Sequence, residues 1–254
     1  MKCAKAIIGL AFALGTQVEA AEITVISTGG ARAVMTSLVP EFERKSGHKV
    51  GIDFGTPGNM RDRLLQGEAA DIAVAIAAIL PDLENAGRIA PGTRMEFAAS
   101  YVGVVVRAGA PKPDVSTPDS LKQAVLAAKT VALSDPKAGT QLGATFIRAA
   151  DRLGFGADLQ SRTKFILGPG SDVAAAVARG EADLGVTLIS EILPVSGAAL
   201  AGELPSSIMP PTVIHAFLMS GAKDAETARA FLDFLRSPDA TKIIEAKGMK
   251  PGPR

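Results

Sequence analysis

The residues best suited to chemistry in this sequence are glycines and small hydroxyl side chains that stand just before predicted helices. Backbone N–H groups at a helix start and the positive end of the helix dipole favour an anion, and glycine allows it to approach closely. Alternatively, such residues only cap the helices. We expect ligand contact where glycine or proline-glycine exceeds what capping needs, and capping at Ser171, where Asp172 follows. Four segments have this composition: 27–30 (STGG), 56–59 (TPGN), 137–140 (KAGT) and 170–172 (GSD).

Two arginines stand beside these segments. Arg32 and Arg61 each fall within the first turn or so of a predicted helix. A cation is unfavourable at that end of the helix dipole, so its presence indicates a nearby anion, which a guanidinium can hold through two hydrogen bonds. A solvated surface arginine is an equally weighted alternative. The predicted ligand-binding residues are therefore Ser27, Thr28, Gly29, Gly30, Arg32, Thr56, Gly58, Asn59, Arg61, Gly139, Thr140 and Ser171.

Other catalytic and metal chemistries find little support. His48 follows a helix-to-strand turn and is expected to be solvated, whereas His215 lies inside a predicted strand, where a core or hinge role outweighs catalysis. Two distant histidines argue against zinc. The sequence has no G-x-S-x-G, H-E-x-x-H, phosphate-loop or dinucleotide motif, so we expect no metal and no cofactor. A cofactor-free acid–base enzyme stays open, because proton transfer needs only one base and an anion clamp.

The first twenty residues have the pattern of a secretory signal peptide. Lys2 and Lys5 precede an apolar run over 6–15, and small residues at Val18 and Ala20 predict cleavage after Ala20. Cleavage would leave 25 basic and 25 acidic residues and no cysteine. We therefore expect an exported, soluble, disulfide-free protein of the periplasm, and the neutral balance argues against nucleic-acid binding.

The mature sequence repeats a strand–turn–helix–strand pattern. It runs first from residue 22 to 75 and again from 129 to 188, and the second strand group ends on an echo of the first: GEAADIAV at 67–74 and GEADLGV at 180–186. Such alternation is typical of a mostly parallel sheet flanked by helices. We expect an α/β protein with two lobes of one design.

Two β-rich runs should connect the lobes. They lie at 98–107 and 212–219, on either side of the second unit. We expect residues 21–103 and 213–254 to form lobe I and residues 104–212 to form lobe II. Two crossing strands make a hinge, and the cleft between the lobes is then the natural ligand site.

The order of these motifs resembles the molybdate-binding-protein-like group of bacterial periplasmic solute-binding proteins. The resemblance rests on ITVISTGGARAVM, VGIDFGTPGNM, GEAADIAV, VALSDPKAGT and GEADLGV, and on the final helix, and it covers nearly the whole mature chain. It implies two lobes joined by two crossing strands, a small anionic ligand and delivery to an ABC permease in the inner membrane. A monomer is the default for such a protein.

The binding residues depart from those of the molybdate binders. Gly30 stands where that group has a serine, the second turn at 55–58 is less rich in serine, and Leu188 replaces a tyrosine that contacts the oxyanion. The loss of hydroxyls weakens a molybdate or tungstate assignment. With two arginines available, the site is better suited to a small organic carboxylate.

One branch that resembles this group consists of exported aconitate isomerases, which interconvert cis- and trans-aconitate by moving a proton. The candidate bases here are Glu191, His215 and Glu96, and no motif chooses among them. We therefore expect a binding protein for a small anion, with the isomerase as the alternative and an anion-sensing module for a membrane receptor as a third reading.

Overall fold

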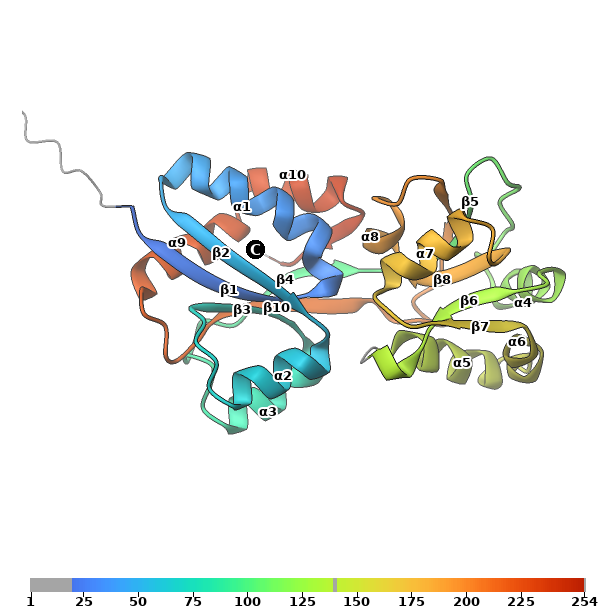
Figure 1. Cartoon of the computed structure of the whole chain (residues 1–254), viewed down its shortest axis with the longest axis horizontal. Helices are drawn as coiled ribbons and strands as arrows, with labels where there is room; N and C mark the ends of the chain where they lie inside the picture. Colours follow the sequence, from blue (N-terminus) through green and yellow to red (C-terminus); the bar gives the residue numbers. More distant parts are fainter. Residues whose placement is uncertain (1–19, 139–140, 254) are drawn as a thin grey trace, which may run out of the picture.

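The computed structural model describes residues 20–138 and 141–253. Most of the predicted signal peptide therefore lies outside the described residues, as do Gly139 and Thr140 of the predicted site. Figure 1 shows two lobes side by side, each built on one sheet. The predicted two-lobed α/β fold is confirmed in this arrangement.

The sheet of lobe I has six strands in the order β11-β4-β10-β3-β1-β2. Strand β1 pairs in parallel with β2 and β3, whereas β10 and β11 join in antiparallel pairs. The sheet is therefore mixed and not mostly parallel as predicted, because the returning strand β10 runs against its neighbours β3 and β4. The bounds are β1 Glu22–Thr28, β2 Lys49–Gly55, β3 Ile72–Ile76, β4 Met95–Ser100, β10 Thr212–Leu218 and β11 Met249–Pro251.

The sheet of lobe II has five strands in the order β7-β6-β8-β5-β9. Strand β6 pairs in parallel with β7 and β8, and β5 pairs antiparallel with β8 and β9. The parallel trio thus repeats the design of lobe I. The bounds are β5 Val102–Arg107, β6 Val131–Ser134, β7 Thr163–Ile166, β8 Leu184–Leu188 and β9 Ala198–Glu203.

Helices cover both faces of each sheet (Figure 1). In lobe I the alternation of β1 sends Val25 toward α1, α9 and α10 and sends Ile26 toward α2 and α3. No helix within residues 20–138 and 141–253 is long and apolar enough to cross a membrane. The helices are η1 Gly29–Ala31, α1 Arg32–Ser46, α2 Pro57–Leu65, η2 Ala77–Ile79, α3 Leu80–Asn85, α4 Pro118–Ala127, η3 Pro136–Ala138, α5 Leu142–Arg152, α6 Gly156–Arg162, α7 Gly170–Ala178, α8 Ile189–Ile192, α9 Ala225–Leu235 and α10 Pro238–Ala246.

The chain changes sheet at two places. It leaves lobe I at Tyr101, between β4 and β5, so the run predicted at 98–107 is two strands. It returns between β9 and β10. The predicted lobe boundaries at 103/104 and 212/213 fall inside β5 and β10, one to three residues from these passages.

The aspartate of the repeated GEA(A)D segment forms an equivalent pair of hydrogen bonds in both lobes. In lobe I the Asp71 carboxylate accepts a hydrogen bond from the backbone N–H of Thr24 at 2.7 Å, and the Asp71 N–H donates to the Thr24 carbonyl at 2.9 Å. In lobe II Asp183 forms the equivalent pair with Thr130, at 3.2 and 3.0 Å. Each aspartate therefore ties the entry of one parallel strand to its neighbour.

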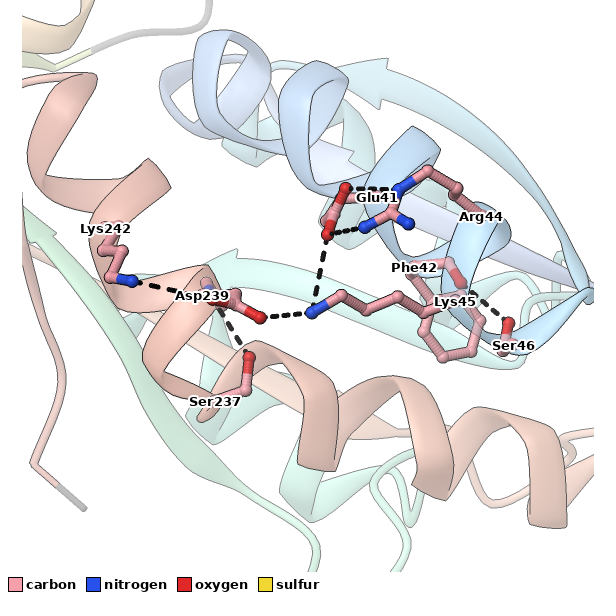
Figure 2. Close-up of polar contacts among 9 residues, drawn as sticks. Glu41, Phe42, Arg44, Lys45, Ser46, Ser237, Asp239 and Lys242 are labelled. Atoms are coloured by element: carbon pink, nitrogen blue, oxygen red, sulfur yellow. Dashed lines mark hydrogen bonds and ion pairs between the residues drawn. The ribbon is translucent and has the colours of Figure 1, made fainter.

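A network of charged side chains joins α10 to α1 (Figure 2). Glu41 pairs with Arg44 at 2.6 Å and with Lys45 at 3.4 Å, and Lys45 also pairs with Asp239. Hydrogen bonding to Arg44 lowers the pKa of Glu41, and hydrogen bonding to Lys45 lowers the pKa of Asp239. All of these side chains are partly exposed, so each pair adds little stability.

This network predicts a small, pH-dependent effect of Lys45→Gln. Because both carboxyl pKa values are lower in the folded state, their stabilisation is present above the unfolded pKa of about 4 and is lost as the pH falls through the folded value. Urea unfolding at pH 7 should show a slightly less stable variant, and the difference from wild type should vanish near pH 2. The loop variant Lys112→Gln serves as control. An equal loss at both pH values would mean that Lys45 acts through packing instead.

Candidate functional site

The start of α1 lacks a capping side chain. Thr28 precedes η1 without a side-chain hydrogen bond to it, and α1 then begins at Arg32, again without a side-chain cap. The Ser27 hydroxyl is buried and donates to the Thr28 carbonyl at 3.3 Å. The capping interpretation therefore fails at 27–30. The first N–H groups of this helical segment, at the half-buried Gly29 and Gly30, lack side-chain acceptors.

Arg32 stands over an aromatic ring at the same helix start. Its guanidinium carbon lies 4.1 Å from the centre of the Phe54 ring, near the end of β2. Arg32 is exposed, and no ion pair holds it within the described part of the chain. Stacking on a ring fixes the plane of a guanidinium and leaves its N–H edge free. Phe54 was not among the predicted residues, although its place just before the 55–58 turn could have indicated it.

The start of α2 is occupied by its own side chains. The Thr56 hydroxyl accepts from the Asn59 N–H at 3.4 Å, which makes Thr56 a capping residue. Arg61 pairs with Asp62 at 2.9 Å and lies 3.9 Å from Asp82 on α3. Ligand contact at Thr56, Gly58, Asn59 and Arg61 stays a prediction, and the capping alternative accounts for Thr56.

The start of α7 holds a carboxylate from the same chain. Glu191 on α8 accepts from the Gly170 N–H at 3.2 Å and from the Thr187 hydroxyl at 2.8 Å. A Cβ atom at residue 170 would overlap both partner groups, so only glycine fits. Ser171 is half-buried and follows Gly170 within the helix. Burial raises the pKa of Glu191, although these hydrogen bonds oppose the shift.

The two lobes meet beside these helix starts. The Ser190 hydroxyl donates to the Gly30 carbonyl at 3.3 Å and lies 2.9 Å from the Ser100 hydroxyl, where the chain leaves lobe I. A Cβ atom at Gly30 would lie 3.2 Å from Leu188 Cδ1. The end of β8 therefore lies against the start of η1. The hydroxyls of Thr187 and Ser190 within TLISE (187–191) could have indicated this segment.

The structure separates the three candidate bases. Glu191 lies at the lobe boundary, whereas His215 and Glu96 are cross-strand neighbours on β10 and β4 of lobe I. His215 is 8% exposed, and its Nδ1 has no hydrogen-bond partner among the described residues. Burial lowers the pKa of His215, and the charge of Arg94 lowers it further. His48, expected to be solvated, accepts from the Ala21 N–H at 3.2 Å.

A cavity in lobe II lies apart from the helix starts at the lobe boundary. A cavity of about 430 Å³ lies in lobe II, between the loop at 110–113, α4 and the turn before β8, away from the lobe boundary. The interlobe cleft therefore stays a prediction. No group of three histidine, cysteine or carboxylate side chains that could hold a metal ion occurs in the part of the chain that the structure describes.

Comparisons with known proteins agree with this architecture. The chain is 34% identical to an aconitate isomerase from Pseudomonas sp. over 236 residues, which cover 91% of this chain and 88% of that protein. It is 29% identical to the molybdate-binding protein ModA of Azotobacter vinelandii over 242 residues, 92% of each chain.

Solved structures show the same fold. The Azotobacter vinelandii periplasmic molybdate-binding protein superposes with a TM-score of 0.72 at 22% identity, over 91% of this chain and all of that one. The substrate-binding domain of a molybdenum ABC transporter from Clostridium difficile, described as putative, gives a TM-score of 0.74 at 17% identity, over 92% and 100%. The sequence model for bacterial extracellular solute-binding proteins matches residues 23–250. The chain therefore belongs to the bacterial extracellular solute-binding protein family.

Proposed function

We propose that this protein captures a small organic carboxylate between its lobes. The observation that carries the proposal is the start of α1, where uncapped N–H groups and the unpaired Arg32 lie together beside the lobe boundary. A ligand carboxylate there would receive a charge-assisted pair from Arg32 and hydrogen bonds from the helix start.

An organic acid suits this site better than a tetrahedral oxyanion. Leu188 faces Gly30 across the boundary, so an apolar methyl group stands over the helix start. The Thr28 side chain is 3% exposed, which leaves little of its hydroxyl accessible. A ligand with a carbon skeleton can contact the leucine, whereas molybdate would lose hydrogen bonds there.

The family and the relatives also support a cellular location and a transport partner for ligand capture. We propose that the protein works in the periplasm after cleavage behind Ala20, as a monomer, and passes its ligand to an ABC permease in the inner membrane. The molybdate-binding relatives support this proposal by their names and by matching nearly the whole chain.

Calorimetric titration of the purified exported protein tests the capture of organic acids. The panel should contain molybdate, tungstate, sulfate, phosphate, succinate, citrate and trans-aconitate. We expect micromolar or tighter binding of at least one organic acid, and a ligand at 100 times its Kd should add about 2.7 kcal/mol to the unfolding free energy. Binding of molybdate alone, or of no anion, would refute the organic-acid assignment.

A second candidate function is isomerisation of a small tricarboxylate such as aconitate. Glu191 favours it, because a half-buried carboxyl group with a raised pKa at the lobe boundary is suited to accept a proton from a carbon atom and return it to another. The relative with 34% identity is an aconitate isomerase. The step moves one proton and needs neither a cofactor nor an oxidant.

Proton NMR in deuterated water separates the two candidates. If the protein is an isomerase, trans-aconitate should give cis-aconitate that carries deuterium, and Glu191→Gln should abolish this while the protein still binds the substrate. Asp119→Asn, a change at an exposed position of α4 in lobe II, is the control. An unchanged spectrum at high protein concentration would leave capture alone as the function.

A further inference from the structure

The facing helix starts of the two lobes differ in charge. In lobe I the start of α1 is open and has Arg32 beside it. In lobe II the start of α7 is filled by Glu191, which takes the Gly170 N–H and the Thr187 hydroxyl. An anion that approaches lobe II therefore meets a carboxylate where a free helix start would attract it.

Glu191 belongs to a segment that contacts lobe I. Its neighbour Ser190 on α8 donates to the Gly30 carbonyl. Leu188, the last residue of β8, also lies against Gly30. Figure 1 shows α8 at the side of lobe II that faces lobe I, with α7 beside it. Glu191 itself is half-buried, and both of its carboxylate oxygens accept hydrogen bonds from lobe II.

We propose that Glu191 selects the charge distribution of the ligand, an inference that rests on the proposed capture of an anion at α1. The part of the ligand that faces lobe II must carry no negative charge: a C–H, a hydroxyl or a protonated carboxyl group. An elongated organic acid can turn its carboxylates to Arg32 and such a group to Glu191. A compact dianion such as sulfate or molybdate presents charge on every side and is repelled.

The alternative is that Glu191 only caps α7. Its two hydrogen bonds explain the helix start without any ligand. The two interpretations differ in what removal of the charge does to anion binding. Capping predicts a loss of stability with unchanged selectivity, whereas charge selection predicts a change in selectivity that stability does not explain.

Two substitutions separate charge from hydrogen bonding. Glu191→Gln removes the charge and can keep contacts with Gly170 and Thr187. Glu191→Ala also frees the Gly170 N–H and the Thr187 hydroxyl for an incoming anion. The probes are sulfate and molybdate as compact dianions, and succinate and trans-aconitate as elongated acids. Asp119→Asn, at an exposed position of α4, is the control, and far-UV circular dichroism with urea unfolding establishes that each variant is folded.

We expect the affinity for sulfate and molybdate to rise about tenfold in Glu191→Gln and further in Glu191→Ala, with less than threefold change for the elongated acids. Wild-type binding of sulfate should strengthen at low pH, where Glu191 becomes protonated, and this pH effect should be missing in Glu191→Gln. The other charged group that raises the pKa of Glu191 is Asp172 on α7, so Asp172→Asn should shift the pH midpoint without removing the effect.

An unchanged ratio of compact to elongated anions in folded Glu191→Gln would overturn the inference and leave Glu191 as a cap. Failure of the proposed capture would look different, because the wild type would then bind no elongated acid. A gain of sulfate binding in the Glu191 variants would still support charge selection in that case, and no gain would refute it.

Discussion

Replacement of Arg32 by glutamine is expected to weaken the binding of organic carboxylates by about 30- to 100-fold. Each hydrogen bond between charged partners contributes about 1.5 to 3 kcal/mol, and a factor of ten in affinity corresponds to about 1.4 kcal/mol. Arg32 forms no salt bridge among the described residues, although its charge reaches Asp53, whose pKa is lowered mainly by Arg63, so a ligand carboxylate would have no hydrogen-bonded ion pair of Arg32 to displace. Calorimetric titration with the acid that binds the wild type most tightly measures the change.

Arg61→Gln is the matched control for this prediction. Arg61 already pairs with Asp62 and Asp82, so its loss should alter affinity less than threefold. Phe54→Leu should weaken binding by an intermediate factor, because it removes the ring that orients Arg32. If Arg61→Gln proves more harmful than Arg32→Gln, the ligand binds at α2 and our placement at α1 is wrong.

Asp71→Ala is expected to lower the unfolding free energy by about 3 to 4 kcal/mol, the largest stability effect that we predict. Asp71 is 4% exposed, and its carboxylate accepts from the N–H groups of Thr24 at 2.7 Å, Lys223 at 2.7 Å and Asp224 at 3.2 Å. Removal of the acceptor leaves three part-buried backbone N–H groups without their partner. Urea unfolding followed by circular dichroism measures the difference.

Asp183 provides a comparison within the same molecule. It forms the equivalent bonds in lobe II, to Lys129 and Thr130, but its side chain is exposed, so water can replace it. Asp183→Ala should therefore lower the unfolding free energy by about 1 kcal/mol. Equal effects of the two substitutions would show that burial does not decide the role of the repeated aspartate.

The fold could be predicted from the sequence because its patterns are local. The apolar alternation of β1 and the spacing of Val34, Leu38 and Phe42 on α1 depend on neighbours along the chain. The repeated GEA(A)D segments predicted two lobes of one design. The repeated segment did not indicate the role of its aspartate: both Asp71 and Asp183 accept hydrogen bonds from the backbone at the entry of a parallel strand.

The site was only partly predictable. Glycines and hydroxyls before a helix have the same appearance in sequence whether the helix start is open, as at α1, capped by its own threonine, as at α2, or filled from elsewhere, as at α7. Arg32 and Arg61 were indistinguishable in sequence for a similar reason. Phe54, which stacks on Arg32, and Asp82, the more distant of the two partners of Arg61, lie more than twenty positions away along the chain, and only the adjacent Asp62 could be seen in the sequence.

The sequence by itself determined that residues 21–254 are formally neutral, are built on two α/β units and have small residues where their helices begin. Only the tertiary structure decided which helix start has N–H groups without a side-chain acceptor. The physical reason is that a capping or counter-charging group acts through space over about 3 Å, and the folded chain brings Glu191 to Gly170, and Leu188 and Ser190 to Gly30, across 21, 158 and 160 positions of sequence.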